Sequence, residues 1–156
     1  MNERKESTTS IILEYVRVIV LTVIATFIFL QFVQISRVNG SSMENTYFQN
    51  NIVLIDKVFY KHSQPKRNDI IIVDYDDGLD DTLIIKRVIA VGGDHLDIKN
   101  NEVYINGKKI KESYIKENMN TEDLSIDIPK GKVFVMGDNR NHSLDSRKLG
   151  YFDFDN

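Results

Sequence analysis

Nineteen consecutive residues near the N-terminus, 18–36, carry no charge, and this run constrains the chain more than any other feature. As a helix rising about 1.5 Å per residue it would span about 28 Å, close to the ~30 Å hydrocarbon core of a bilayer. A cleavable signal peptide is the main alternative, but its apolar region covers only about 7–15 residues and ends at a small-x-small site. Residues 31–37 contain no such site, so we expect a retained transmembrane anchor.

Basic residues on either side of the apolar run predict its orientation. Three precede it and one follows it closely: Arg4, Lys5, Arg17 and Arg37. Because cytoplasmic flanks are enriched in Lys and Arg, we expect residues 1–17 to be a cytoplasmic tail and residues 37–156 to be an extracytoplasmic domain. The chain would then be a single-pass protein of the cell membrane, in contact with lipid.

The charge balance and the absence of cysteine exclude several function classes. The net charge is −3 and the isoelectric point is near 5.6, whereas a nucleic-acid-binding domain usually presents a basic face. Without cysteine the chain has no disulfide, no cysteine-based zinc site and no cysteine nucleophile. Its 156 residues suffice for one domain beside the anchor.

Beyond the apolar run, the hydrophobic pattern changes to that of short β-strands. Five stretches rich in β-branched and aromatic residues are expected to be strands or a hairpin: 52–60, 69–75, 82–91, 102–110 and 132–136. Within the fourth, Asn106-Gly107 supplies the two positive-φ positions of a tight hairpin turn. Residues 113–127 are polar without clear periodicity, and we interpret them as a surface excursion. The predicted fold class is mainly β.

The seven residues 40–46, Gly-Ser-Ser-Met-Glu-Asn-Thr, lie between the apolar run and the first strand. All but Met43 are small or polar, and Met43 directly follows Ser42. A solvated linker has no need of that methionine, whereas a serine held against a surface by a packed neighbour does. Taken alone, a flexible juncture is the simpler interpretation. If the chain contains a base that could activate Ser42, a nucleophilic serine becomes the better interpretation.

Lys86 is the candidate base, because it interrupts the apolar run 82–91. A lysine that guards an edge strand against aggregation is the alternative. If the ammonium group is buried instead, desolvation favours the neutral amine and the pKa falls. A neutral lysine is a general base that can activate a nearby serine.

The stretch 137–147 follows the last strand and combines two acids, two arginines and two serines. Such a combination suits a hydrogen-bonded scaffold that holds a site together. Other polar residues are weaker candidates. The acidic residues of 74–81 lack the glycine and glutamate positions of a calcium loop. The histidines show no metal-ligand spacing, although a Ser-His-Asp triad using one of them stays open: His62, His95 and His142.

Together these stretches resemble the type I signal peptidases, which are membrane-anchored serine-lysine proteases of bacteria. The family's nucleophile motif corresponds to residues 42–46, its lysine motif to Lys86-Arg87 with Gly93-Asp94, and its final motif to residues 137–147. Order and spacing agree over nearly the whole chain.

The resemblance implies a coiled, mostly antiparallel β-sheet domain after one transmembrane helix. It implies Ser42 as the nucleophile, Lys86 as the general base and Ser143 as a residue that orients the lysine. It also implies four structural supports: Arg87, Asp138, Asp145 and Arg147. Neither a metal nor a cofactor is needed. The substrates would be secreted precursors bearing signal peptides, and no nucleic acid is involved.

Several positions depart from the family pattern. Proline is common where Asn45 and Gly92 stand, and Gly-Asp is common where residues 50–51 are Asn-Asn, so we expect looser turns there. Some members use a serine hydroxyl at the position of Gly40 to stabilise the oxyanion. Here backbone N–H groups, including that of Ser42, would serve. Residues 151–154 resemble the approach to a further strand, which predicts a truncated or shortened C-terminus.

Two other functions remain open. A self-cleaving serine-lysine repressor domain shares the chemistry, but the apolar run and the lack of a DNA-binding helix pair disfavour it. A membrane-anchored paralogue that binds without turnover is the other, and the presence of both Ser42 and Lys86 weighs against it.

Overall fold

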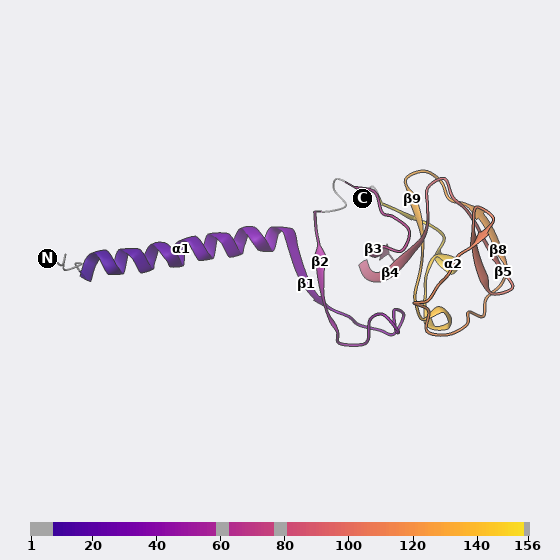
Figure 1. Ribbon diagram of the computed structural model, residues 1–156, viewed down its shortest axis with the longest axis horizontal. Coiled ribbons are helices and arrows are strands. Elements are labelled where there is room, and N and C mark those ends of the chain that lie inside the picture. The colour runs from indigo at the N-terminus through magenta and orange to yellow at the C-terminus, as the bar shows by residue number, and fades with distance from the viewer. Residues whose placement is uncertain (1–7, 59–62, 77–80, 155–156) are drawn as a thin grey trace. The chain divides into compact units, whose positions relative to one another are not determined.

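A computed structural model of the chain describes residues 8–58, 63–76 and 81–154 (Figure 1). The chain divides into two compact units. One combines Met1–Ser36 with Leu54–His62, and the other combines Arg37–Val53 with Ser63–Asn156. The expected mainly β fold after an N-terminal helix is confirmed, and the candidate residues of the serine-lysine site belong to the second unit.

Helix α1, Thr8–Phe32, has 25 residues, and none of its side chains is buried against the rest of the chain. Among the described residues it is the one helix that is long and apolar enough to cross a bilayer. It begins ahead of the uncharged run 18–36 and ends within that run, because Val33–Arg37 forms strand β1 and pairs with β2, Ile52–Asp56. An apolar helix with no protein cover is consistent with a membrane anchor.

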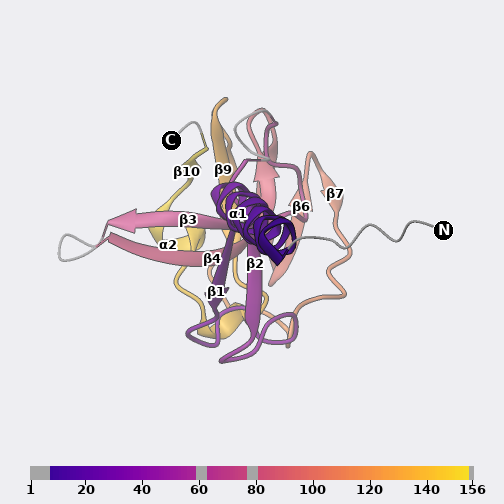
Figure 2. The ribbon, with the colours of Figure 1, turned by 90° about the vertical axis from the view of Figure 1, so that its left-hand side faces the viewer.

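The larger of the two sheets in the second unit has the order β10-β9-β4-β3, and all its strands are antiparallel. Figure 2 shows β3 and β4 as a long pair, with short β10 beside β9. Three of the predicted strands occur here, and the pairing of β10 was not expected. The bounds are Ile70–Asp76 for β3, Asp81–Val91 for β4, Lys132–Met136 for β9 and Phe152–Asp153 for β10.

The other sheet has the order β7-β6-β5-β8. Its bounds are His95–Lys99 for β5, Glu102–Ile105 for β6, Lys108–Lys109 for β7 and Leu124–Asp127 for β8. The Asn106-Gly107 turn is confirmed, with φ of 50° and 76°. The surface excursion predicted for 113–127 is wrong at its end, where alternating half-buried and exposed residues form β8. Part of the predicted strand 52–60 lies outside the described residues.

Two hydrophobic clusters form the core, of which the first joins the two sheets and the second lies on the other face of the larger sheet. One packs β4 and β9 against β5 and β6, with Phe134 and Leu96 at its centre, and the other joins β3 to the opposite face of β4 and β9 around Val88 and Val135. Strands β4 and β9 are therefore buried on both faces, which explains their nearly continuous apolar sequences. A charged side chain on β4 in this region has little access to water.

Candidate active site

Ser42 lies at the start of a tight turn that follows β1. The turn is closed by backbone hydrogen bonds from Glu44 to Ser41 and from Tyr47 to Met43, at 3.1 and 2.8 Å. The Met43 side chain is 2% exposed and fixes the turn to the body of the domain. Ser42 itself remains half-buried, so its hydroxyl is both held and accessible, as the pattern of residues 40–46 suggested.

Lys86 reaches this serine from the inside of the larger sheet. Its Nζ atom lies 2.9 Å from Ser42 Oγ and 3.0 Å from the carbonyl oxygen of Ile85. The residue is 3% exposed, and β4 is an inner strand flanked by β3 and β9, so the interpretation as an edge-strand guard does not hold. Burial lowers the pKa of Lys86, although the charge of Asp145 opposes the shift.

Arg87, the next residue, faces away from Lys86 along the strand and binds Asp138 through two hydrogen bonds of 2.8 and 2.7 Å. Its third nitrogen donates to the carbonyl oxygen of Asn68 at 3.0 Å. Thr46 joins the pair, because its hydroxyl donates to Asp138 and accepts from Arg87. This network fastens the end of the serine turn to β4. Burial disfavours the charge of Arg87, but Asp138 outweighs it and raises the Arg87 pKa.

Asp145 and Arg147 form a second two-pronged ion pair, with both N–O distances 2.8 Å. The Asp145 carboxylate is fully buried, also accepts the backbone N–H of Gly137 at 3.0 Å, and caps the short helix α2, Ser146–Leu149. Although burial disfavours its ionised form, Arg147 and the Gly137 N–H hold the Asp145 pKa below its usual value. Arg147 also donates to the carbonyl oxygen of Arg140 at 2.6 Å.

Ser143 lies in the same region, but no hydrogen bond links it to Lys86 in the described structure, so its role in orienting the lysine remains a prediction. Its buried Oγ atom makes no hydrogen bond of good geometry among the described residues, but it lies close enough to Asp145 to help lower the pKa of that carboxyl group. A Cβ atom at Gly137 would come within 3.0 Å of both Ser143 Oγ and the Ser42 carbonyl oxygen. Glycine is therefore required where the final stretch crosses the serine turn.

Sequence patterns did not reveal several residues of this region. Tyr114 packs its ring 4.0 Å from the guanidinium carbon of Arg87, and its hydroxyl donates to Glu112. Glu112 in turn binds the buried Arg140. These contacts place the first part of the supposed surface excursion against the site. Asn139 was quoted only as part of the final stretch, yet it hydrogen-bonds to the serine turn directly.

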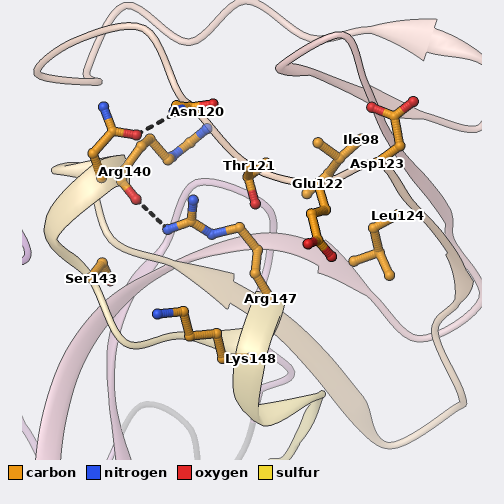
Figure 3. A pocket seen from close by; sticks show the side chains of 11 residues that line it. Ile98, Asn120, Thr121, Glu122, Asp123, Leu124, Arg140, Ser143, Arg147 and Lys148 are labelled. Carbon is orange, nitrogen blue, oxygen red and sulfur yellow. Dashed lines mark hydrogen bonds between the residues drawn. The ribbon is translucent and has the colours of Figure 1, made fainter.

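A polar pocket of about 440 Å³ lies beside this scaffold. Figure 3 shows Arg140 and Ser143 on one side of it and Glu122 and Leu124 on the other, with Arg147 between them. The charged groups of Arg140 and Arg147 already have partners within the chain. The pocket therefore presents no unpaired arginine to a ligand.

The departures from the family pattern have local explanations. Asn45 and Asn50 have φ of 88° and 69°, values that proline cannot adopt, and the Asn45 amide donates to the Tyr114 carbonyl oxygen at 3.1 Å. A Cβ atom at Gly92 would approach the backbone of residues 129–130 within 3.0 Å. The structure thus gives each departure a local role: Asn45 makes a long-range hydrogen bond, and Gly92 allows close packing.

Among the described residues, neither His95 nor His142 hydrogen-bonds to the Ser42 side chain, whose partner is Lys86. His95 sits between Asp127, at 2.6 Å, and Ser125, at 3.3 Å, but the Ser125 hydroxyl donates to Asp97 rather than to the imidazole. His62 and part of the acidic stretch 74–81 lie outside the described residues. Within the described ranges, no group of three or more His, Asp or Glu side chains is arranged to hold a metal ion.

Comparison with known proteins identifies the family. Residues 12–156 match the family described as signal peptidase, peptidase S26. The chain is 33% identical to signal peptidase I P of Bacillus subtilis subsp. natto and 34% identical to signal peptidase I S of Bacillus subtilis strain 168, covering 97% of this chain and 88% of each relative. A crystal structure of a signal peptidase I from Enterococcus faecalis V583 aligns with a TM-score of 0.51 and 29% identity, over 60% of this chain and 92% of that one. The chain belongs to the S26 family of serine peptidases, the signal peptidases I.

Proposed function

We propose that this protein removes signal peptides from secreted precursors through a catalytic pair formed by Ser42 and Lys86. The observation that carries the proposal is the 2.9 Å contact between Lys86 Nζ and Ser42 Oγ, made by a lysine that is 3% exposed. A serine nucleophile needs a base within about 2.6–3.2 Å. Among the described residues, Lys86 is the titratable group that meets this condition for Ser42.

Catalysis begins with neutral Lys86, which accepts the hydroxyl proton of Ser42 as the serine oxygen attacks the scissile carbonyl carbon. The tetrahedral intermediate collapses when protonated Lys86 gives its proton to the departing amine, leaving the precursor's signal peptide as an acyl ester on Ser42. Lys86 then takes a proton from water as the water oxygen attacks the ester carbon, and gives it to the departing Ser42 Oγ, which restores the serine hydroxyl and the neutral amine. The lowered Lys86 pKa supports this cycle, since it keeps more of the amine neutral near physiological pH.

The supporting residues act by holding the two reacting groups together. Arg87 and Asp138 fasten the serine turn to the strand that carries Lys86. Asp145 and Arg147 order the loop of Gly137 and Ser143, which packs behind the pair. Small displacements of the reacting groups lower the reaction rate strongly, so we assign these residues positioning roles.

The substrate would lie extended along a strand edge, held by main-chain hydrogen bonds. Shallow apolar pockets would accept the small side chains at the first and third positions before the cut. Helix α1 would anchor the enzyme in the cell membrane with residues 37–156 on the outer face, so that enzyme and membrane-tethered precursor share one thin layer.

The direct test uses the full chain in detergent with a precursor that carries an Ala-x-Ala site. Mass spectrometry should show one cut directly after the second alanine, and Ser42→Ala should abolish it while retaining the thermal unfolding midpoint. A wild-type protein that binds this precursor without cutting it would instead identify a binding paralogue.

A further inference from the structure

Asn139 makes two hydrogen bonds to the serine turn, although 97 positions separate it from Ser42 in the sequence (139 − 42). Its backbone N–H donates to the Ser42 carbonyl oxygen at 3.0 Å, and its side-chain Nδ2 donates to the Ser41 carbonyl oxygen, also at 3.0 Å. The residue is 1% exposed and lies immediately before the 3₁₀ turn η2, Arg140–His142. It therefore hydrogen-bonds to the peptide units on both sides of the Ser42 Cα atom.

The bond to Ser41 determines where the Ser42 N–H points. No peptide bond among the described residues is cis, so the Ser41 carbonyl and the Ser42 N–H point in opposite directions across one planar unit. Fixing the carbonyl toward Asn139 thus fixes the N–H away from it. Among the hydrogen bonds that the described residues form, none uses this N–H as its donor. Gly40 offers no side-chain hydroxyl for the same task.

The chemistry of the contact requires an amide at position 139. The Ser41 oxygen can only accept a hydrogen bond, and it already accepts one from the Glu44 N–H at 3.1 Å, so the nitrogen of the Asn139 amide must face it. The other end of the amide, Oδ1, is buried and has no partner among the described residues. A buried acceptor without a hydrogen bond lowers stability. We infer that the side chain is kept for the hydrogen bond that its Nδ2 group donates.

We propose that Asn139 is a positioning residue for the oxyanion hole, because it orients the Ser41–Ser42 peptide so that the Ser42 N–H can donate to the developing oxyanion. The inference rests on the proposed function of Ser42. It concerns the transition state: a preorganised donor acts where charge develops, and hardly at all on the uncleaved substrate.

The test replaces Asn139 with leucine, which has a similar size but no donor, and with aspartate, which keeps the shape but places oxygen against oxygen. Removal of one oxyanion donor costs about 10²–10³ in kcat. Because misorientation of a retained donor is milder, we expect kcat to fall by about 10- to 100-fold with KM unchanged. The acidic limb of the pH profile should not move in the uncharged leucine variant, since Lys86 is not contacted. In the aspartate variant the added carboxylate should move the limb to higher pH, because a nearby negative charge raises the pKa of Lys86. If the leucine variant does not fold, the aspartate variant decides.

A second readout separates oxyanion binding from general loop order. A peptide aldehyde traps the enzyme when Ser42 Oγ adds to the aldehyde carbon, its proton passes to Lys86, and the carbonyl oxygen becomes the oxyanion. The Asn139 variants should bind this aldehyde more weakly by the same factor that kcat falls, and should bind the product peptide, which has no oxyanion, as the wild type does. Equal weakening of both ligands, or an unchanged kcat, would overturn the proposal.

Ser125→Ala is the control. It also removes a side-chain hydrogen bond, the one donated to the buried Asp97 at 2.8 Å, but Ser125 lies on β8 in the other sheet and outside the final stretch. Its unfolding midpoint should drop while kcat and aldehyde affinity stay at the wild-type values. If the wild type and the Asn139 variants cleave equally well, only the role of Asn139 is refuted. If the wild type does not cleave, the proposed function itself is refuted.

Discussion

Lys86 Nζ lies 2.9 Å from Ser42 Oγ, and the two residues belong to elements of different character. Lys86 is fixed on an inner strand whose neighbours hold it on both sides. Ser42 sits on a turn that is tied to that strand by the contacts of Arg87 with Asp138 and Thr46. The short distance therefore depends on a network, and both the pair and the network make testable predictions.

Ser42→Ala and Lys86→Ala should each lower cleavage by at least about 10³-fold without unfolding the domain, because residues that act as one unit lose their function together. Lys86→Arg should be equally inactive, since guanidinium stays protonated. Replacing His62, His95 and His142 with glutamine is the control and should leave cleavage measurable. If the triple histidine variant does not cleave and the Lys86→Ala variant does, the base is a histidine.

Asp145→Ala should act through stability as well as activity. The carboxylate is fully buried against Arg147, and removing one partner of such a pair costs about 3–5 kcal/mol. Each kcal/mol lost lowers the unfolding midpoint of a domain of this size by roughly 4 °C. The midpoint of the variant should therefore lie more than about 10 °C below that of the wild type. Asp153→Ala breaks the exposed pair with Lys132 and should change stability by about 1 kcal/mol or less. An unshifted midpoint with lost activity would make Asp145 a direct participant in catalysis.

Gly137→Ala should abolish cleavage, because the added methyl group meets the Ser42 carbonyl oxygen and Ser143 Oγ together. Gly92→Ala makes a comparable clash with the backbone of residues 129–130, away from the site. Both variants should unfold at lower temperature, but the Gly92 variant should retain its kcat at temperatures where it is folded. Equal kcat values for the two variants would mean that the fit around Ser42 tolerates the displacement.

Local pattern predicted much of the fold because its strands follow alternating or continuous apolar runs, and Asn106-Gly107 marks its own turn. Strand β5 was not predicted, because Asp97 interrupts its short apolar segment. That aspartate is tolerated in a buried position because Ser125 and Lys99 bind it.

The motifs singled out Ser42 and Lys86, which the structure brings into contact, whereas several residues that hold this pair in place were not predictable. Asn139 and Tyr114 act through contacts with segments far away in the sequence, such as the bond from Asn45 to the Tyr114 carbonyl oxygen. No periodicity or spacing within residues 113–127 records a contact of that kind. Only the folded chain shows which polar residues face the serine turn.

The proposed membrane orientation makes a prediction for intact cells. With residues 1–17 in the cytoplasm, a protease added outside cells stripped of their wall should digest the chain beyond Arg37. The N-terminal tail should become accessible only after lysis. Protection of residues 37–156 until lysis would place the catalytic domain on the inner side of the membrane.

The pH dependence of cleavage tests the state of Lys86 most directly. Free lysine titrates near 10.4, and burial lowers the pKa of Lys86 in the folded protein. Only the neutral amine accepts the Ser42 proton, so the rate should rise with pH through the lowered pKa and reach its plateau before 10.4. Asp145 opposes the shift, and the neutral variant Asp145→Asn, studied where it remains folded, should therefore move the acidic limb to lower pH. A limb that stays near 10.4 would mean that Lys86 is solvated in the working enzyme, and the burial that supports its role as base would be refuted.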